Sequence, residues 1–207
     1  MKIKRTANAG VLLELDGVSI LLDGICGEVP PYIATPEEIR EELYSAPPDI
    51  VVFTHIHTDH YDKDFALFFE KNAQRKILSP ENKDEMGVGS VKIQSVDSRH
   101  IGRNDIEHIS FVIQGSRCAY FMGDASPITL KKMGCFPKPD VLFVPFAYFS
   151  SESAAEITKS IGADKIVLLH MPNKENDDYK IWDTVNNFII SEQNIHILKI
   201  GETLEIY

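Results

Sequence analysis

A run of apolar and β-branched residues at positions 49–54 ends abruptly in the segment His55-Ile56-His57-Thr58-Asp59-His60. Such a short β-branched run is typical of a buried strand. In an extended segment residues i and i+2 point to the same side, so His55 and His57 can bind one cation together. Once the chain turns away from the strand, Asp59 and His60 point elsewhere and can reach a second cation. The cluster therefore predicts a strand followed by a metal-binding loop.

The rest of the chain alternates short strands with helices. Strands are expected where β-branched and aromatic residues gather between turn signals, at residues 3–5, 11–15, 18–23, 76–78, 91–96, 109–113, 118–122, 141–144, 165–169, 195–200 and 203–207. Helical spacing of apolar residues covers residues 36–44, 62–71, 152–161 and 179–191. Thr35 is the expected N-cap of the first helix, because Glu38 follows it at the spacing of a capping box.

Strand pairs flanked by helices occur in both halves of the chain, which favours an α+β fold. We expect two mixed β-sheets packed face to face with helices on the outside, a four-layer αβ/βα sandwich. No linker divides the 207 residues, so residues 1–207 are expected to form a single domain. The apolar content of 43% is enough for a substantial core.

Composition limits the partners that this chain is expected to have. The formal net charge of −10 disfavours nucleic acid, because the field repels phosphate backbones. No apolar stretch approaches the ~20 residues needed to span a bilayer, and no secretory signal is readable, so membrane insertion is not expected. Cys26, Cys118 and Cys135 are widely spaced and odd in number, which fits a reducing cytoplasm. The sequence does not indicate an oligomeric state.

The segment THIHTDH resembles the signature of the metallo-β-lactamase-fold hydrolase superfamily. That pattern requires a later His after a strand, an Asp that commonly follows Gly, and a last His after a late strand. The chain has His100, Gly123-Asp124 and His170 in this order. The DHYD segment and the short length also resemble the branch that contains ascorbate-6-phosphate lactonase and N-acyl-phosphatidylethanolamine phospholipase D.

The resemblance implies a set of metal ligands. His55, His57 and His100 would bind one metal, Asp59, His60 and His170 would bind the other, and Asp124 would bridge them. Imidazole and carboxylate ligands without a thiolate suit zinc, so two Zn²⁺ per chain are expected, although manganese, iron and nickel accept the same ligands. No separate organic cofactor is expected. Asp59 is also the expected catalytic residue, because its free oxygen could orient the attacking water and receive its proton.

Several other residues are candidates for supporting roles. Asp23, Asp62 and Thr54 could accept imidazole N–H groups and fix their tautomers; turn or cap roles compete evenly. Arg99, Arg103 and Lys174 are expected to be solvated surface residues, with contact to a substrate anion as the alternative. His108 and His196 fall outside the ligand pattern and are expected to be ordinary strand residues.

The expected function is hydrolysis of a small ester, lactone or phosphodiester by metal-activated water. A nuclease is the first alternative, disfavoured by the acidic charge and by the short chain. The second is a mononuclear iron oxidoreductase on the same fold, which only metal analysis would exclude. The third is a non-catalytic binding module, disfavoured because every ligand is retained. The chain contains neither a G-x-S-x-G elbow nor a P-loop. Catalysis by a serine nucleophile and P-loop nucleotide hydrolysis are therefore not expected, because each depends on one of these motifs.

Overall fold

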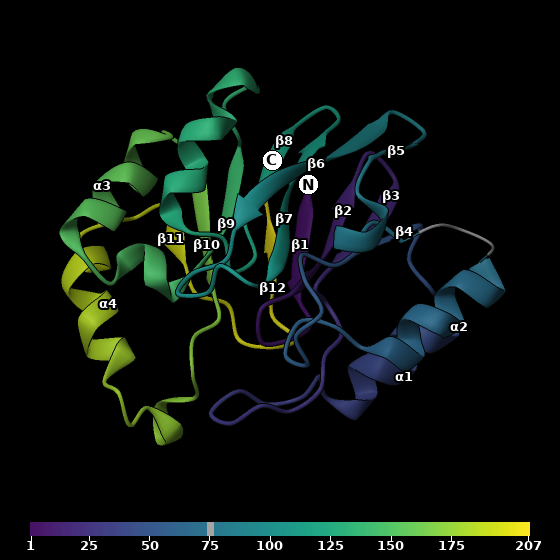
Figure 1. The fold of residues 1–207 in the computed structure, drawn as a ribbon, viewed down its shortest axis with the longest axis horizontal. Helices are drawn as coiled ribbons and strands as arrows, with labels where there is room; N and C mark the ends of the chain where they lie inside the picture. Colours follow the sequence, from purple (N-terminus) through teal and green to yellow (C-terminus); the bar gives the residue numbers. More distant parts are fainter. Residues whose placement is uncertain (74–76) are drawn as a thin grey trace.

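Two β-sheets pack face to face between two layers of helices in the computed structural model, which describes residues 1–73 and 77–207 (Figure 1). The first sheet has the order β12-β1-β2-β3-β4. Its strands are β1 (Lys2–Arg5), β2 (Val11–Leu15), β3 (Val18–Leu22), β4 (Ile50–Val52) and β12 (Thr203–Glu205). Only β3 and β4 pair in parallel, so the sheet is mixed.

The second sheet has the order β11-β10-β9-β8-β7-β6-β5. Its strands are β5 (Glu85–Val88), β6 (Val91–Arg99), β7 (Glu107–Gln114), β8 (Cys118–Phe121), β9 (Val141–Pro145), β10 (Lys165–Leu169) and β11 (Ile195–His196). The strands from β8 to β11 pair in parallel, whereas those from β5 to β8 pair antiparallel. As a result β6 runs in the same direction as β8, β9 and β10.

Alternation along the strands divides the apolar residues between the central core and the outer faces. The residues of one parity meet between the sheets, and they include Leu13, Leu22, Val52, Phe111, Phe121, Phe143 and Val167. Residues of the other parity, such as Leu21, Val51, Tyr120 and Leu142, face the helices. These strands are apolar on both faces because both sheets are covered on both sides.

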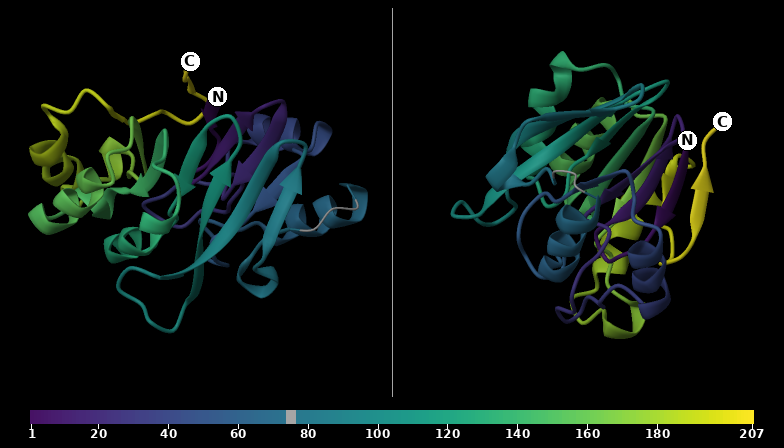
Figure 2. Two further views of the ribbon diagram at one scale, coloured as in Figure 1. Left: turned by 90° about the horizontal axis from the view of Figure 1, so that it is seen from above. Right: turned by 90° about the vertical axis from the view of Figure 1, so that its right-hand side faces the viewer.

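Each outer layer of helices covers one sheet (Figures 1 and 2). Against the first sheet lie α1 (Glu37–Ser45) and α2 (Lys63–Ala73), through Leu43, Phe65 and Phe69. Against the second lie α3 (Glu152–Ser160), α4 (Ile181–Ile189) and the 3₁₀ helices η2 (Pro127–Cys135) and η3 (Phe146–Phe149). Two shorter 3₁₀ turns are η1 (Pro80–Asn82) and η4 (Lys174–Asn176). The predicted four-layer α+β sandwich is therefore confirmed.

The structure corrects several local expectations. Pro36, not Thr35, is the N-cap of α1, and the Thr35 hydroxyl instead accepts a hydrogen bond from Cys26 N–H at 2.9 Å. The strand expected at residues 76–78 lies partly outside the described residues, and within them Leu78 forms an isolated bridge with Val52. The strand β5 and helices η2 and η3 were not predicted, because their apolar residues follow neither helical nor strand periodicity over a useful length. Within the described chain, no helix has both the length and the apolar character to cross a bilayer.

Candidate metal centre

The residues expected to bind metal come together at one edge of the two sheets. His55, His57, Asp59 and His60 follow β4, and His100, Asp124 and His170 follow β6, β8 and β10 respectively. Because β6, β8 and β10 run in the same direction, their carboxyl ends meet at a single edge of the second sheet. This edge faces the carboxyl end of β4 in the first sheet. Topology thus assembles side chains that are more than a hundred positions apart in the sequence.

The predicted ligands form two groups of three donor residues, and a third group joins Asp23 to His55 and His60. His55, His57 and His100 offer ligand atoms within 4.8 Å of one another, and so do Asp59, His60 and His170. In the first group, His55 Nε2 lies 3.0 Å from His57 Nδ1. Such spacing lets the three donors of a group reach one ion, since metal–nitrogen bonds are about 2.0–2.1 Å long.

Asp124 lies between the two groups. Its Oδ2 is 3.5 Å from His60 Nε2, 3.6 Å from His170 Nε2 and 3.8 Å from His100 Nε2. This carboxylate therefore faces one imidazole of the first group and two of the second. A carboxylate in this position could contact cations held by either group.

Several imidazole nitrogens of the cluster have no hydrogen-bond partner within the described chain. His60 Nε2, His100 Nε2 and both ring nitrogens of His170 are buried without a hydrogen-bond partner among the described residues. Burial lowers the pKa of His55 and of His57, assisted by neighbouring imidazoles, which favours the neutral ring that binds metal. Buried donors left unpaired in this way are costly unless a ligand satisfies them. The site thus fits divalent metal ions.

Asp23 holds two of these imidazoles in the metal-binding tautomer. The fully buried carboxylate accepts hydrogen bonds from Thr54 N–H at 2.7 Å, from the Thr54 hydroxyl at 2.6 Å and from His60 Nδ1 at 2.9 Å. Because the Thr54 hydroxyl donates to Asp23, its oxygen is free to accept from His55 Nδ1, 3.0 Å away. Burial raises the pKa of Asp23, and the bonds from His60 and Thr54 counteract that rise. Both imidazoles therefore direct Nε2 into the site.

The backbone at the site adopts unusual conformations. Asp23 (φ 46°) and His170 (φ 61°) are in the left-handed region, which non-glycine residues rarely occupy. Gly123, just before Asp124, has φ 53°, and a Cβ atom there would lie 2.6 Å from the Thr54 side chain. Backbone of this kind is typical of functional sites, because the surrounding structure must stabilise it.

His108 is a residue of the site that the sequence analysis missed. Its buried ring lies 5.0 Å from the His55 ring and 5.7 Å from the His100 ring between centroids. Its Nε2 accepts the N–H of Asp124 at 3.0 Å, and Ser98 Oγ lies 2.6 Å from its Nδ1. Burial lowers its pKa to about 3, which keeps the ring neutral. His108 therefore positions Asp124, although no local motif around it indicated this role.

Some of the other supporting candidates contact the predicted ligands, and the rest bond elsewhere. Asp23 and Thr54 hold imidazoles as described, whereas Asp62 accepts Phe65 N–H at 2.8 Å as the cap of α2 and pairs with Arg40. Arg103 pairs with the exposed Asp105. Lys174 lies over the Trp182 ring, 4.7 Å from its centroid. His100 Nδ1 donates to Ile101 O at 2.6 Å, which directs its Nε2 into the site.

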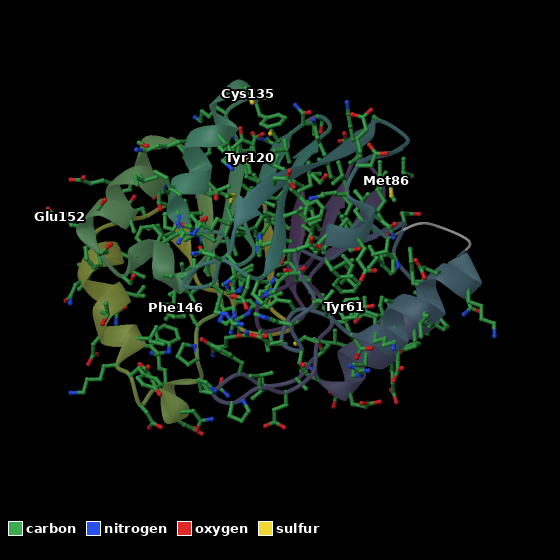
Figure 3. All side chains as sticks on the ribbon, viewed as in Figure 1. Tyr61, Met86, Tyr120, Cys135, Phe146 and Glu152 are labelled. Atoms are coloured by element: carbon green, nitrogen blue, oxygen red, sulfur yellow. The ribbon has the colours of Figure 1, made fainter. Side chains whose placement is uncertain are left out.

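Aromatic side chains border the centre. The Tyr32 ring lies edge-on to His170 at 4.1 Å between centroids, and the Phe146 ring lies 6.3 Å from it. In Figure 3, side-chain nitrogens gather between the labelled Phe146 and Tyr61, at the end of the sheets where the strands that carry the site terminate. These rings therefore lie on the His170 side of the candidate metal centre.

The chain belongs to the beta-lactamase superfamily, because the model of the beta-lactamase superfamily domain matches residues 2–170. The matched region includes every proposed ligand from His55 to His170. This finding confirms the superfamily resemblance, while the narrower branch stays a prediction. No curated protein sequence matches the chain.

Solved structures with the same fold include enzymes of different chemistry. An isothiocyanate hydrolase from Delia radicum gut bacteria is 20% identical, with a TM-score of 0.71 and coverage of 100% of this chain and 99% of that chain. A metallo hydrolase from the archaeon Ignicoccus hospitalis is 18% identical (TM-score 0.68, 100% and 99% coverage). The diiron β-hydroxylase CmlA from Streptomyces venezuelae is 12% identical (TM-score 0.63), and the match covers 99% of this chain and 54% of CmlA. At these identities the likeness establishes the fold alone.

Proposed function

We propose that this protein is a dinuclear metal-dependent hydrolase that cleaves a small ester, lactone or phosphodiester. The observation that carries the proposal is the pair of three-residue donor groups with the Asp124 carboxylate between them. His55, His57 and His100 would hold one ion, Asp59, His60 and His170 the other, and Asp124 both. The donors are imidazole and carboxylate groups without a thiolate, a set that favours zinc.

The residues of the chain would divide the chemical work. Bound divalent ions supply a water of lowered pKa and polarise the bond under attack. Asp59 lies 3.1 Å from His170 Nε2, and one carboxylate oxygen can remain free to orient that water and take its proton. His170 contacts this carboxylate, and Tyr32 lies edge-on to the His170 ring. Asp23 and His108 would keep the ligands oriented, and both are buried away from the space that a substrate would occupy.

Metal analysis is the first test of the proposal. We expect about two zinc ions per chain in protein purified without added metal, and a loss of metal in His170→Ala. His196→Ala is the matched control, because His196 lies on β11 outside both donor groups. Asp124→Ala should loosen metal binding, whereas Asp59→Ala should reduce turnover by more than its loss of metal explains.

Turnover is measured with nitrophenyl esters, lactones and bis-nitrophenyl phosphate at saturating zinc, manganese or iron. Hydrolysis of one of these classes, lost in Asp59→Ala, supports the proposal. Two bound zinc ions without turnover of any class would contradict it and favour a binding module. One iron ion per chain would instead favour the alternative of a mononuclear iron oxidoreductase on the same fold.

A further inference from the structure

A cavity of about 440 Å³ adjoins the candidate metal centre through Asn8 and Tyr32. Residues of its wall include Arg5, Asn8, Tyr32, Lys174, Trp182 and Lys199. Tyr32 also contacts the His170 ring, and the Asn8 carbonyl accepts His170 N–H at 3.2 Å, so cavity and metal centre share a wall. In Figure 1 the loop that carries Tyr32 and the segment after β10 lie together at the lower end of the molecule. We call this space the Arg5 cavity.

Arg5 brings a buried positive charge to the cavity. Its side chain is only 7% exposed, and its guanidinium donates to the carbonyls of Ala7, Asn8 and Leu198. These three bonds leave two of the five guanidinium N–H groups available. Burial lowers the pKa of Arg5 to about 10, and no Asp or Glu in the described part of the chain acts on it. A buried cation without a carboxylate partner is costly and favours binding of an anion.

The rest of the wall has the same electrostatic character. The Asn8 side chain is 2% exposed, and its amide nitrogen has no hydrogen-bond partner among the described residues. Lys174 and Lys199 add two exposed cations, and none of the described residues that line the cavity is acidic. This is unusual in a chain of net charge −10. The space on the other side of the Tyr32 loop is the opposite, with Glu28, Glu175 and Asp178 in its wall.

Apart from Asn173, the remaining residues of the Arg5 cavity are apolar. Ile33, Met171, Ile197 and Ile200 contribute to it, together with the Trp182 ring. An organic anion with an apolar body matches both features, because the apolar wall gains from burial of carbon while the cations and the free amide meet the oxyanion. A ligand that is neutral or cationic as a whole would leave the positive groups of the cavity without a partner.

We propose that the Arg5 cavity binds the carboxylate or phosphate group and adjoining apolar part of the substrate, and so selects amphiphilic organic anions. This inference rests on the proposed hydrolase function, because one end of the substrate would lie in the cavity while its cleaved bond lies at the metal centre beside His170. Tyr32 would then separate the recognised part of the substrate from the bond that is cleaved.

Trp182 makes the binding step directly measurable. It is the only tryptophan of the chain, it lines the cavity, and Lys174 lies over its ring. We would titrate octanoate, octyl phosphate and octylammonium into zinc-loaded protein and into the same protein after chelation, and follow tryptophan emission. Octanoate and octyl phosphate should change the emission in both forms, with octylammonium at least about tenfold weaker. The tighter of the two anions identifies which oxyanion the cavity prefers.

Two substitutions test the charges. Lys199→Glu should weaken anion binding by about tenfold, a change of roughly 1.4 kcal/mol. Lys131→Glu is the matched control with the same change in net charge, on η2 outside the cavity wall. Asn8→Asp, which places a carboxylate beside Arg5, should abolish anion binding, and Lys199→Glu still gives a result if the Asn8 variant does not fold.

The outcomes separate this inference from the proposed function. Octanoate that changes Trp182 emission and raises KM for an active ester, with kcat unchanged, supports it. Turnover without anion binding, or anion binding without an effect on KM, would overturn the inference and leave the hydrolase proposal intact. An equal response to octylammonium would overturn it as well. Absence of turnover would refute the hydrolase proposal, and the substrate assignment of the cavity with it.

Discussion

Replacement of Asp23 by Asn is the perturbation that tests the site most directly. The change preserves size but converts one of two accepting oxygens into a donating NH₂ group. One amide oxygen can still accept Thr54 N–H, now bonded at 2.7 Å. The NH₂ group would face the Thr54 hydroxyl and His60 Nδ1, both of which donate to Asp23 in the native protein. His60 can then keep a hydrogen bond only as the other tautomer, which places a proton on Nε2.

The magnitude follows from this tautomer change. A protonated Nε2 cannot bind metal, and loss of such a supporting partner typically costs 10–100-fold in metal affinity, or about 1.4–2.8 kcal/mol. The metal-free protein should also lose stability, by about 1.5–3 kcal/mol for each lost hydrogen bond to the charged carboxylate. Zinc affinity is measured by competition with a chromophoric chelator, and stability by calorimetry of the metal-free protein.

Asp62→Asn is the matched control for this experiment. It makes the same change in a carboxylate that caps α2 and pairs with Arg40, away from the donor groups. We expect a loss of up to about 1 kcal/mol in stability, typical of partly exposed pairs, and native zinc affinity. Native zinc affinity in Asp23→Asn itself would refute the role of Asp23 in fixing the tautomer of His60.

Three further predictions concern the same region. Gly123→Ala should destabilise the protein by at least about 2 kcal/mol, because alanine is strained at φ 53° and its Cβ would meet Thr54 at 2.6 Å. Gly134→Ala is the control, because a Cβ there meets no atom within 4 Å. Equal calorimetric midpoints for the two variants would contradict this prediction. His108→Phe should cost about 1–3 kcal/mol and weaken zinc binding, because Asp124 N–H loses its acceptor; native values in calorimetry and zinc titration would show that His108 is dispensable. Zinc at a hundredfold excess over its Kd should stabilise the protein by about 2.7 kcal/mol relative to chelator-treated protein, and coincident melting curves would argue against a native metal centre.

The Arg5 cavity gives the site an asymmetry that a ligand list alone does not describe. One side of the Tyr32 loop is basic and apolar, whereas the other is acidic. An anionic substrate would be attracted to the first and repelled by the second, because low-dielectric walls strengthen the local field. The overall negative charge of the chain therefore does not predict the charge of the ligand.

The sequence alone determined the fold class and the group of candidate ligands. Periodicity two along the strands and the helical spacing between them depend on local residue order, so the four-layer arrangement could be predicted from it. Imidazole and carboxylate side chains carry their metal preference with them, and their order along the chain identified the superfamily. The elements η2 and β5 were missed because their apolar residues follow no regular helical or strand pattern.

Only the tertiary structure decided which residues support the ligands. His108 is the second residue of β7, which pairs antiparallel with both β6 and β8. This pairing brings the ring beside Asp124, sixteen positions further along the chain. Asp62 follows His60 closely in the sequence and Asp23 precedes it by 37 positions, yet only Asp23 bonds to His60, because β3 pairs in parallel with β4. The Arg5 cavity likewise gathers residues from both ends of the chain. Such contacts arise from the pairing of strands that are distant in the sequence, and local periodicity carries no information about that pairing.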